Sequence, residues 1–157
     1  MNGRSKLYGL AAHLLKRLRE LDWVAILLVR LSVGLLFFES GRGKLFFRLE
    51  ELGAYFVDLG IPLPHLNAFV VASLEFAGGA CLIVGVATRL IALLLGFIMV
   101  VAILTAQIST VHTLGDFLYL PEVLLVVILI WLVFSGPGRV SIDHLLARRL
   151  ELERWEA

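Results

Sequence analysis

The sequence predicts an all-α membrane protein: a four-transmembrane-helix bundle with amphipathic surface helices at the N-terminus, in the first outer loop and at the C-terminus. Hydrophobic residues make up 60% of the 157 residues, and the mean hydropathy is +0.94. A soluble domain carries roughly 45–50% apolar residues, and here the excess is gathered into long blocks. A chain of this length is expected to form one compact membrane domain.

Four apolar blocks are expected to cross the membrane as helices. They cover residues 23–44, 66–86, 90–107 and 117–135, and each is close to the ~20 residues of one crossing. The first block is longer than the core of a signal peptide and has no small-residue cleavage site after it, so we expect it to be retained. An even number of crossings places both termini on the same side of the membrane.

The basic residues indicate which side this is. Those that flank the blocks on the side of the termini are Arg4, Lys6, Lys16, Arg17, Arg19, Arg89, Arg139, Arg148, Arg149 and Arg154. Residues 108–116, on the other side, hold no Lys or Arg. The positive-inside rule therefore places both termini in the cytoplasm, although Arg42, Lys44 and Arg48 lie on the outer side.

Three surface helices are expected outside the 23–135 membrane domain. In residues 1–22, leucines recur at helical spacing and the basic residues lie largely off this apolar stripe. This pattern is typical of a helix lying on an anionic membrane surface. Apolar residues recur every three or four positions in 49–59, which predicts a lid-like helix on the outer surface. Residues 136–157 begin with a Gly-Pro-Gly stop, and Ser141 can cap a final cytoplasmic helix. Each of these helices could be inert or could dock a partner protein.

Four ionisable residues fall inside the expected crossings: Arg30, Glu39, Glu75 and Glu122. Such residues are costly in hydrocarbon and usually face a partner or a cavity. With a rise of about 1.5 Å per residue, Glu75 lies near the centre of its helix and Arg30 lies about 5 Å to the cytoplasmic side of its own. The two side chains could therefore pair, either to fix helix packing or to form a functional site.

Glu39 and Glu122 share a second level, about 6–8 Å outside the centre. Two carboxylates close together there would favour sharing a proton. The sequence favours a simpler arrangement for Glu39, in which it reaches outward to Arg42 and Lys44. Pro121, directly before Glu122, predicts a kink that frees backbone carbonyls near that carboxylate.

Other residue types narrow the chemistry. Gly34 and Gly79 lie one turn from Arg30 and Glu75, where small residues favour close helix packing over a ligand cleft. The histidines lie outside the crossings, which argues against a haem in the bundle, and no metal-ligand spacing is present. Cys81 is the single cysteine, so no disulfide can form within the chain. No basic–aromatic cluster indicates a nucleic-acid partner.

Ordered motifs along the chain resemble the DoxX family. The resemblance covers roughly residues 27–145 and is carried by Arg30–Phe37, Gly41–Leu45, Leu59–Pro62, Glu75–Gly79, Gly85, Thr88-Arg89, His112 with Gly115, Glu122, Gly136–Arg139 and Ser141–Asp143. It implies a four-helix protein of the bacterial inner membrane. It also carries over the positions Arg30, Gly34, Lys44, Glu75, Gly79, Arg89, His112, Glu122 and Arg139. The family includes small subunits of thiosulfate:quinone oxidoreductases and a member that associates with redox-defence enzymes.

The resemblance implies a membrane subunit of a redox system, in sulfur or oxidative-stress metabolism, that interacts with quinone for a partner oxidoreductase. Quinone reduction consumes two protons with two electrons, so buried acids have a plausible task. The candidate catalytic residues are Glu75, Arg30, Glu122 and Glu39. The candidate quinone-binding residues are Gln107, His112, Gly34 and Gly79. The chain carries no flavin, NAD, haem or iron–sulfur motif, so whether it is itself an enzyme stays open.

Two other functions remain. The chain could be a non-catalytic anchor that recruits partner proteins, with the buried charges only specifying helix pairing. It could also be a small proton-coupled carrier, although four crossings are few and no inverted repeat is evident, so a carrier would need several copies of the chain. All three functions place the chain in a lipid bilayer. The redox subunit and the anchor would also need a protein partner.

Overall fold

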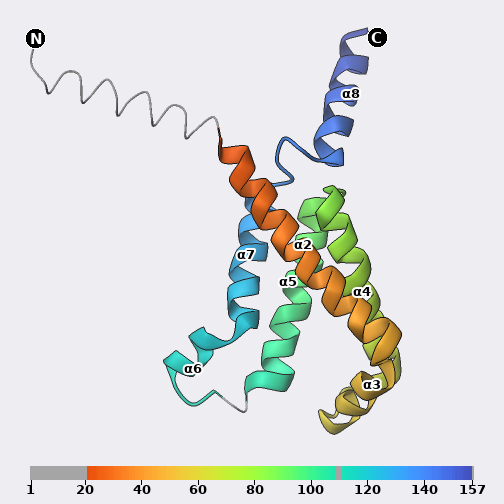
Figure 1. The fold of residues 1–157 in the computed structure, drawn as a ribbon, viewed down its shortest axis with the longest axis vertical. Helices are drawn as coiled ribbons and strands as arrows, with labels where there is room; N and C mark the ends of the chain where they lie inside the picture. Colours follow the sequence, from red (N-terminus) through yellow and green to blue (C-terminus); the bar gives the residue numbers. More distant parts are fainter. Residues whose placement is uncertain (1–20, 109–110, 157) are drawn as a thin grey trace, which may run out of the picture.

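The computed structural model describes residues 21–108 and 111–156, and this part of the chain forms helices without any strand (Figure 1). The elements are α2 (Asp22–Phe47), α3 (Leu49–Asp58), α4 (Pro64–Val84), α5 (Thr88–Ala102), the π-helix η1 (Ile103–Gln107), α6 (Leu114–Tyr119), α7 (Pro121–Ser135) and α8 (Ile142–Glu156). The surface helix expected for residues 1–22 lies almost entirely outside the described residues.

Within the described residues, three helices are long and apolar enough to cross a membrane: Trp23–Phe47, Pro64–Val84 and Thr88–Gln107. A fourth crossing was expected over 117–135, but this segment is divided. Leu120 is extended, with φ −66° and ψ 125°, and separates α6 from α7. The cause is Pro121, because a residue before proline is disfavoured in the helical region. The apolar helix α7 that follows has 15 residues, so it is shorter than the other three.

Local signals explain where the helices begin and end. Pro64 occupies the first turn of α4, where its missing N–H costs nothing. Gly85 ends α4 with φ 77° and donates its N–H to the Cys81 carbonyl. A capping box between Thr113 and Asp116 begins α6. The N–H groups of His112 and Thr113, and the Thr113 hydroxyl, hold the pKa of Asp116 below its usual value.

The four apolar helices of the bundle pack as two pairs, α2 with α4 and α5 with α7, and these pairs make the most extensive contacts. Figure 1 shows the pairs close together at the end that carries α8 and spread apart towards the end that carries α3 and α6. At the closed end, Leu82, Leu95, Leu129 and Leu132 form the buried core between the pairs. The spread end is therefore where the bundle leaves room for a cavity.

The α2–α4 pair depends on glycine. A Cβ on Gly79 would lie 2.3 Å from the backbone nitrogen of Phe38, and one on Gly41 would lie 2.2 Å from that of Phe76. A Cβ on Gly34 would likewise lie 3.0 Å from Ile83 and 3.1 Å from the carbonyl oxygen of Gly79. These glycines let the two backbones touch, as the small-residue spacing indicates. Gly34 and Gly79 thus lie in a packed seam and not against the cavity described below.

Arg30 is buried but does not approach Glu75, so the Arg30–Glu75 pair considered from helix depth is wrong. Its guanidinium donates to the carbonyls of Pro137 and Val140, in the segment between α7 and α8. A helix places Arg30 about 7 Å from the centre of α2, and its long side chain reaches back towards the nearer end. The loop carbonyls freed by the Gly-Pro-Gly stop supply its partners.

Asp143 completes this closure at the same end of the bundle. Its carboxylate accepts hydrogen bonds from the backbone N–H groups of Ala87 and Thr88, at 2.8 and 2.9 Å, so it caps α5. Ser141 accepts from the N–H of His144 and begins α8, as the sequence predicts. The C-terminal segment is therefore tied both to α2 and to the α4–α5 turn.

We expect Gly79→Ala to lower the free energy of unfolding by about 1–3 kcal/mol, because the added methyl group would force α2 and α4 apart. Gly96→Ala is the matched control, since its Cβ would lie 3.7 Å from Leu129 in ordinary contact. It should be neutral or slightly stabilising. Thermal unfolding of both variants in one detergent checks this, and equal melting temperatures would contradict the proposed role of the seam.

Candidate functional site

A cavity of about 840 Å³ lies between the two helix pairs at their spread end. Its walls come from α2, α3, α4, α5, η1 and α7, and are mostly apolar. The polar side chains that line it are Ser40, Lys44, Asn67, Glu75, Thr105, Gln107 and Glu122. A largely apolar hollow with a few converging polar groups is the usual form of a small-molecule site.

Glu75 is the buried charge on the α4 wall. Glu75 is only 1% exposed. Its two carboxylate oxygens each lie 2.6 Å from the ammonium nitrogen of Lys44. The Ser40 hydroxyl donates to one of the same oxygens at 3.0 Å. A carboxylate without such partners would be strongly unfavourable in this apolar setting.

The sequence arranges this contact through helix spacing. Ser40 and Lys44 are one turn apart on α2, so both side chains can reach the same point on a neighbouring helix. Gly41 lies between them and lets α2 touch the backbone of α4 at Glu75 and Phe76. The Lys44 side chain stays 28% exposed, so the ion pair is buried at its acidic end and open at its basic end.

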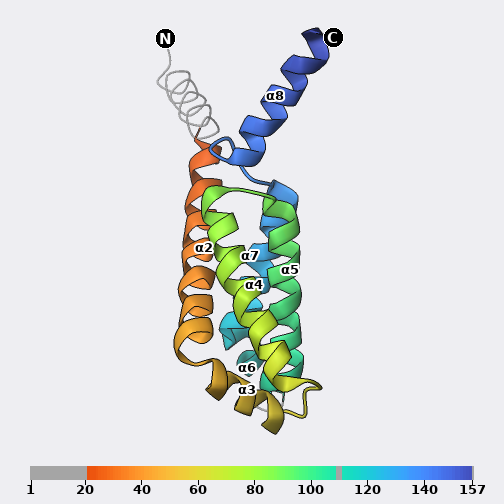
Figure 2. The same cartoon turned by 90° about the vertical axis from the view of Figure 1, so that its right-hand side faces the viewer.

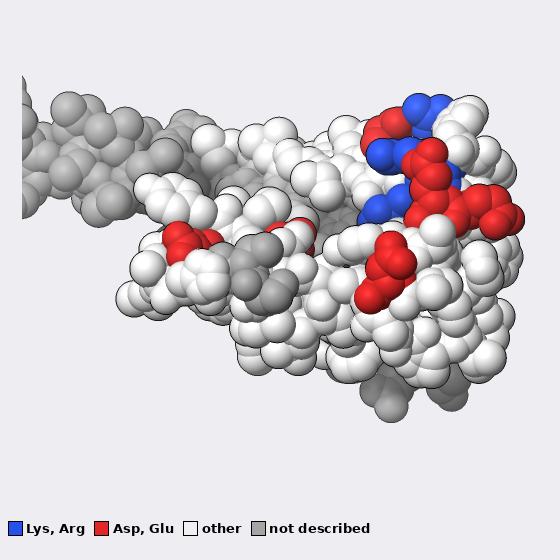
Figure 3. Space-filling view, turned by 90° about the horizontal axis from the view of Figure 1, so that it is seen from below, with Lys and Arg blue, Asp and Glu red and all other residues white. Residues whose placement is uncertain are grey.

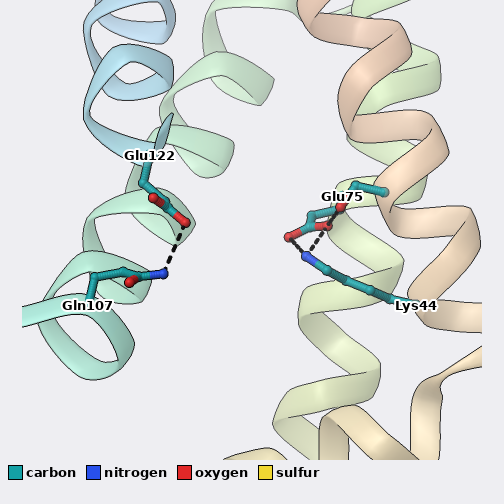
Figure 4. Close-up of polar contacts among 5 residues, drawn as sticks. Lys44, Glu75, Gln107 and Glu122 are labelled. Carbon is teal, nitrogen blue, oxygen red and sulfur yellow. Dashed lines mark hydrogen bonds and ion pairs between the residues drawn. The ribbon is translucent and has the colours of Figure 1, made fainter. Parts of the chain in front are cut away.

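Gln107 and Glu122 form a second polar group on the opposite wall. The Gln107 amide donates to one oxygen of Glu122 at 3.4 Å. The other oxygen of Glu122 is buried and has no hydrogen-bond partner among the described residues. Glu122 lies in the first turn of α7, where a helix favours a negative charge. Figure 4 shows this group and the Lys44–Glu75 pair pointing towards each other.

The π-helix η1 brings Gln107 to this wall. It follows α5 directly and spans Ile103–Gln107. A π-helical turn is rare and is frequently found at functional sites. Thr105, Ala106 and Gln107 all line the cavity, so the irregular turn coincides with the hollow. No residue in this segment distinguishes it from the regular helix before it, because the apolar block runs through both.

Three of the residues predicted from the sequence come together here: Glu75, Gln107 and Glu122. Glu39 does not join them. It is exposed and pairs with Arg42 at 2.7 Å, which is the outward arrangement that the sequence favoured over a carboxylate pair with Glu122. Lys44, expected beside Glu39, lies with Glu75 instead.

His112 also lies apart from the cavity lining, in the exposed connection before α6, where its backbone N–H donates to Asp116. Arg30 belongs to the closed end of the bundle. In the part of the chain that the structure describes, no three His, Cys, Asp or Glu side chains are grouped to hold a metal ion. The candidate site is therefore a mostly apolar cavity with a polar group on each of two facing walls.

Sequence reasoning missed Ser40 and assigned Lys44 to the wrong partner. The available signal was the combination of Ser40, Gly41 and Lys44, which places two polar groups and a close-contact position on adjacent turns of one helix. Figure 3 shows this end of the molecule from below, with the basic side chains and many of the acidic ones gathered along one side and further acidic ones on the other. The ammonium group of Lys44 is tolerated here because its side chain is partly exposed.

We expect Lys44→Met to lower the free energy of unfolding by about 2–3 kcal/mol, below the cost for a fully buried pair because part of Lys44 is exposed. Glu75 would lose its countercharge, and adding Glu75→Gln should restore most of the loss. Arg42→Met is the control on the same helix, where an exposed pair contributes less than about 1 kcal/mol. Melting temperatures in one detergent measure all four proteins, and an equal loss in Arg42→Met would contradict a special role for the Lys44–Glu75 pair.

Comparisons with known proteins give relatives and a family for this chain. A "Putative oxidoreductase CatD" of Bacillus subtilis is 33% identical over 86 residues, which cover 55% of this chain and 62% of that protein, less than two thirds of its length. An "Uncharacterized membrane protein Rv3486" of Mycobacterium tuberculosis is 31% identical over 137 residues, or 80% of this chain and 83% of that protein. No solved structure gives a significant match. The DoxX family model matches residues 25–108, and the chain belongs to the DoxX family of membrane proteins.

Proposed function

We propose that this chain is the membrane subunit of a bacterial redox system and that its cavity binds a quinone. One observation carries the proposal: Glu75 is only 1% exposed, and it lines an apolar cavity of about 840 Å³. The volume lies within the roughly 300–1,000 Å³ of small-molecule pockets. A purely structural ion pair would not need a hollow of this size beside it.

The polar groups fit a ring that carries two oxygens. Lys44 and Ser40 can donate hydrogen bonds at one wall, and the Gln107 amide can donate at the other. Glu75 and Glu122 can accept from a hydroxyl group or hold a proton. The unpartnered oxygen of Glu122 is the strongest sign of a missing ligand, because buried acceptors are almost always satisfied.

A bound quinone would accept two electrons and two protons and leave as a quinol. The chain's own residues would bind and orient the ring and hold protons at the Glu75 and Glu122 carboxyl groups. The electrons would come from a partner oxidoreductase, since the sequence carries no motif for a flavin, NAD or iron–sulfur group. The name of the Bacillus relative supports a redox function in the family.

We also propose how the chain is oriented in the membrane. The charge pattern favours both termini in the cytoplasm of a bacterial inner membrane, with α7 completing the fourth crossing. The cavity and α3 would then face the outer half of the membrane, with α3 as the expected lid. Sulfur or oxidative-stress metabolism is the setting that the family suggests.

A scaffold is the second candidate function. One observation favours it: α8 extends away from the bundle, at the opposite end to the cavity (Figure 2). Its exposed residues include Leu145, Leu146 and Arg148, a mixture that a partner protein could use. The anchor and the quinone subunit differ in one property, which is whether the cavity holds a ligand.

Mass spectrometry of an organic extract from mildly solubilised protein should find quinone near one molecule per chain. Glu75→Gln should reduce this content by about tenfold, which corresponds to ~1.4 kcal/mol of binding, because the variant keeps the shape but removes the charge held by Lys44. Glu39→Gln is the matched control, since Glu39 is an exposed carboxylate on the same helix as Lys44 and should leave the content unchanged.

Two results would overturn the proposal. One is folded, monodisperse wild-type protein without quinone, which would favour the scaffold. The other is unchanged quinone in Glu75→Gln, which would remove Glu75 from the site.

A further inference from the structure

The cavity has an opening between α4 and α5. The two helices touch near their shared turn, where Gly78 faces Ile91 and Leu95. Figure 1 shows them separating from there towards the spread end of the bundle. Contacts between α4 and α5 are much less extensive than those within the two helix pairs, so this side of the cavity is not sealed.

The side chains along this opening are both cavity lining and outer surface. Those that line the cavity and are also exposed are Val70 and Leu74 on α4, and Leu94, Phe97 and Val101 on α5. Phe97 is 67% exposed. A lining side chain that also faces outward marks the mouth of a cavity. All five are apolar, so this mouth has no group that needs water.

The other routes into the cavity are different. Towards α7, α2 and α7 also make few contacts, but the exposed side chains that line the cavity there are only Leu36 on α2 and Pro121 on α7. At the spread end, α3 lies against α4 and contributes Leu52 and Phe56 to the lining, and the surface there is charged. The α4–α5 mouth therefore carries the most exposed apolar lining, with five side chains against two on the α7 side.

We propose that the α4–α5 mouth is a lateral portal, and that it selects a ligand with a long hydrocarbon tail. The ligand enters from the lipid with its ring towards Lys44 and Glu75, and its tail stays between Val70, Leu74, Phe97 and Val101. This inference rests on the proposed quinone site, because it assigns the tail of the same ligand. The continuity of one cavity from the ion pair to the five exposed side chains supports it.

The test compares two adjacent valines. Val101 lines the cavity and is 37% exposed, whereas Val100 is 39% exposed and does not line it. Val101→Trp narrows the mouth, and Val100→Trp places the same bulk on the outer surface. Each protein is reconstituted in nanodiscs and titrated with ubiquinone or menaquinone, each with either a single isoprene unit or a full-length tail. Val70→Trp repeats the block from the α4 wall.

We expect Val101→Trp and Val70→Trp to weaken binding of the full-length quinone by about tenfold. Binding of the single-unit quinone should change by less than about threefold, and Val100→Trp should bind both probes like the wild type. The single-unit probe also serves as the control for folding.

The failures can be told apart. A wild type that binds neither probe overturns the proposed quinone site itself. A wild type that binds both probes, with unchanged or equally weakened binding in Val101→Trp and Val70→Trp, keeps that site and overturns the portal. Selective loss of the full-length quinone in Leu36→Trp, without it in Val101→Trp, also overturns it, because the tail would then leave towards α7.

Discussion

The close approach of α2 and α4 is the constraint on which the rest of the structure depends. Gly34, Gly41 and Gly79 bring the two backbones into contact, and only at that separation can Lys44 place its ammonium 2.6 Å from both oxygens of Glu75. The ion pair in turn makes a carboxylate tolerable beside an apolar hollow. The glycine contact, the ion pair and this wall of the cavity therefore depend on one another. The wall formed by α5, η1 and α7 does not depend on this contact.

The helices followed from the sequence because long apolar blocks leave a chain few alternatives to helix in a membrane. The family followed from motif order. Packing predictions succeeded where they depended on size, as at Gly79, since a missing Cβ has the same meaning in any helix pair. The division at Pro121 was visible in the sequence as a kink, but its effect on the length of α7 was not.

Pairing between charges was less predictable, for a physical reason. Depth along a helix is a single coordinate, and Arg30 and Glu75 are close in that coordinate. Their partners were decided by rotation about the helix axes and by the loop after α7, which offers Arg30 the carbonyls of Pro137 and Val140. The π-helix could not be predicted either, because its register depends on tertiary packing and not on residue type.

The length of α2 has a mechanical consequence. This helix is unbroken over 26 residues, and it carries Arg30 in its first half and Lys44 in its last turn, about 21 Å apart by helical rise. Arg30 holds the segment that leads into α8, and Lys44 holds Glu75 at the cavity. Because one continuous helix joins the two contacts, a displacement of the segment before α8 would be transmitted along α2 towards the ammonium group of Lys44 at the cavity.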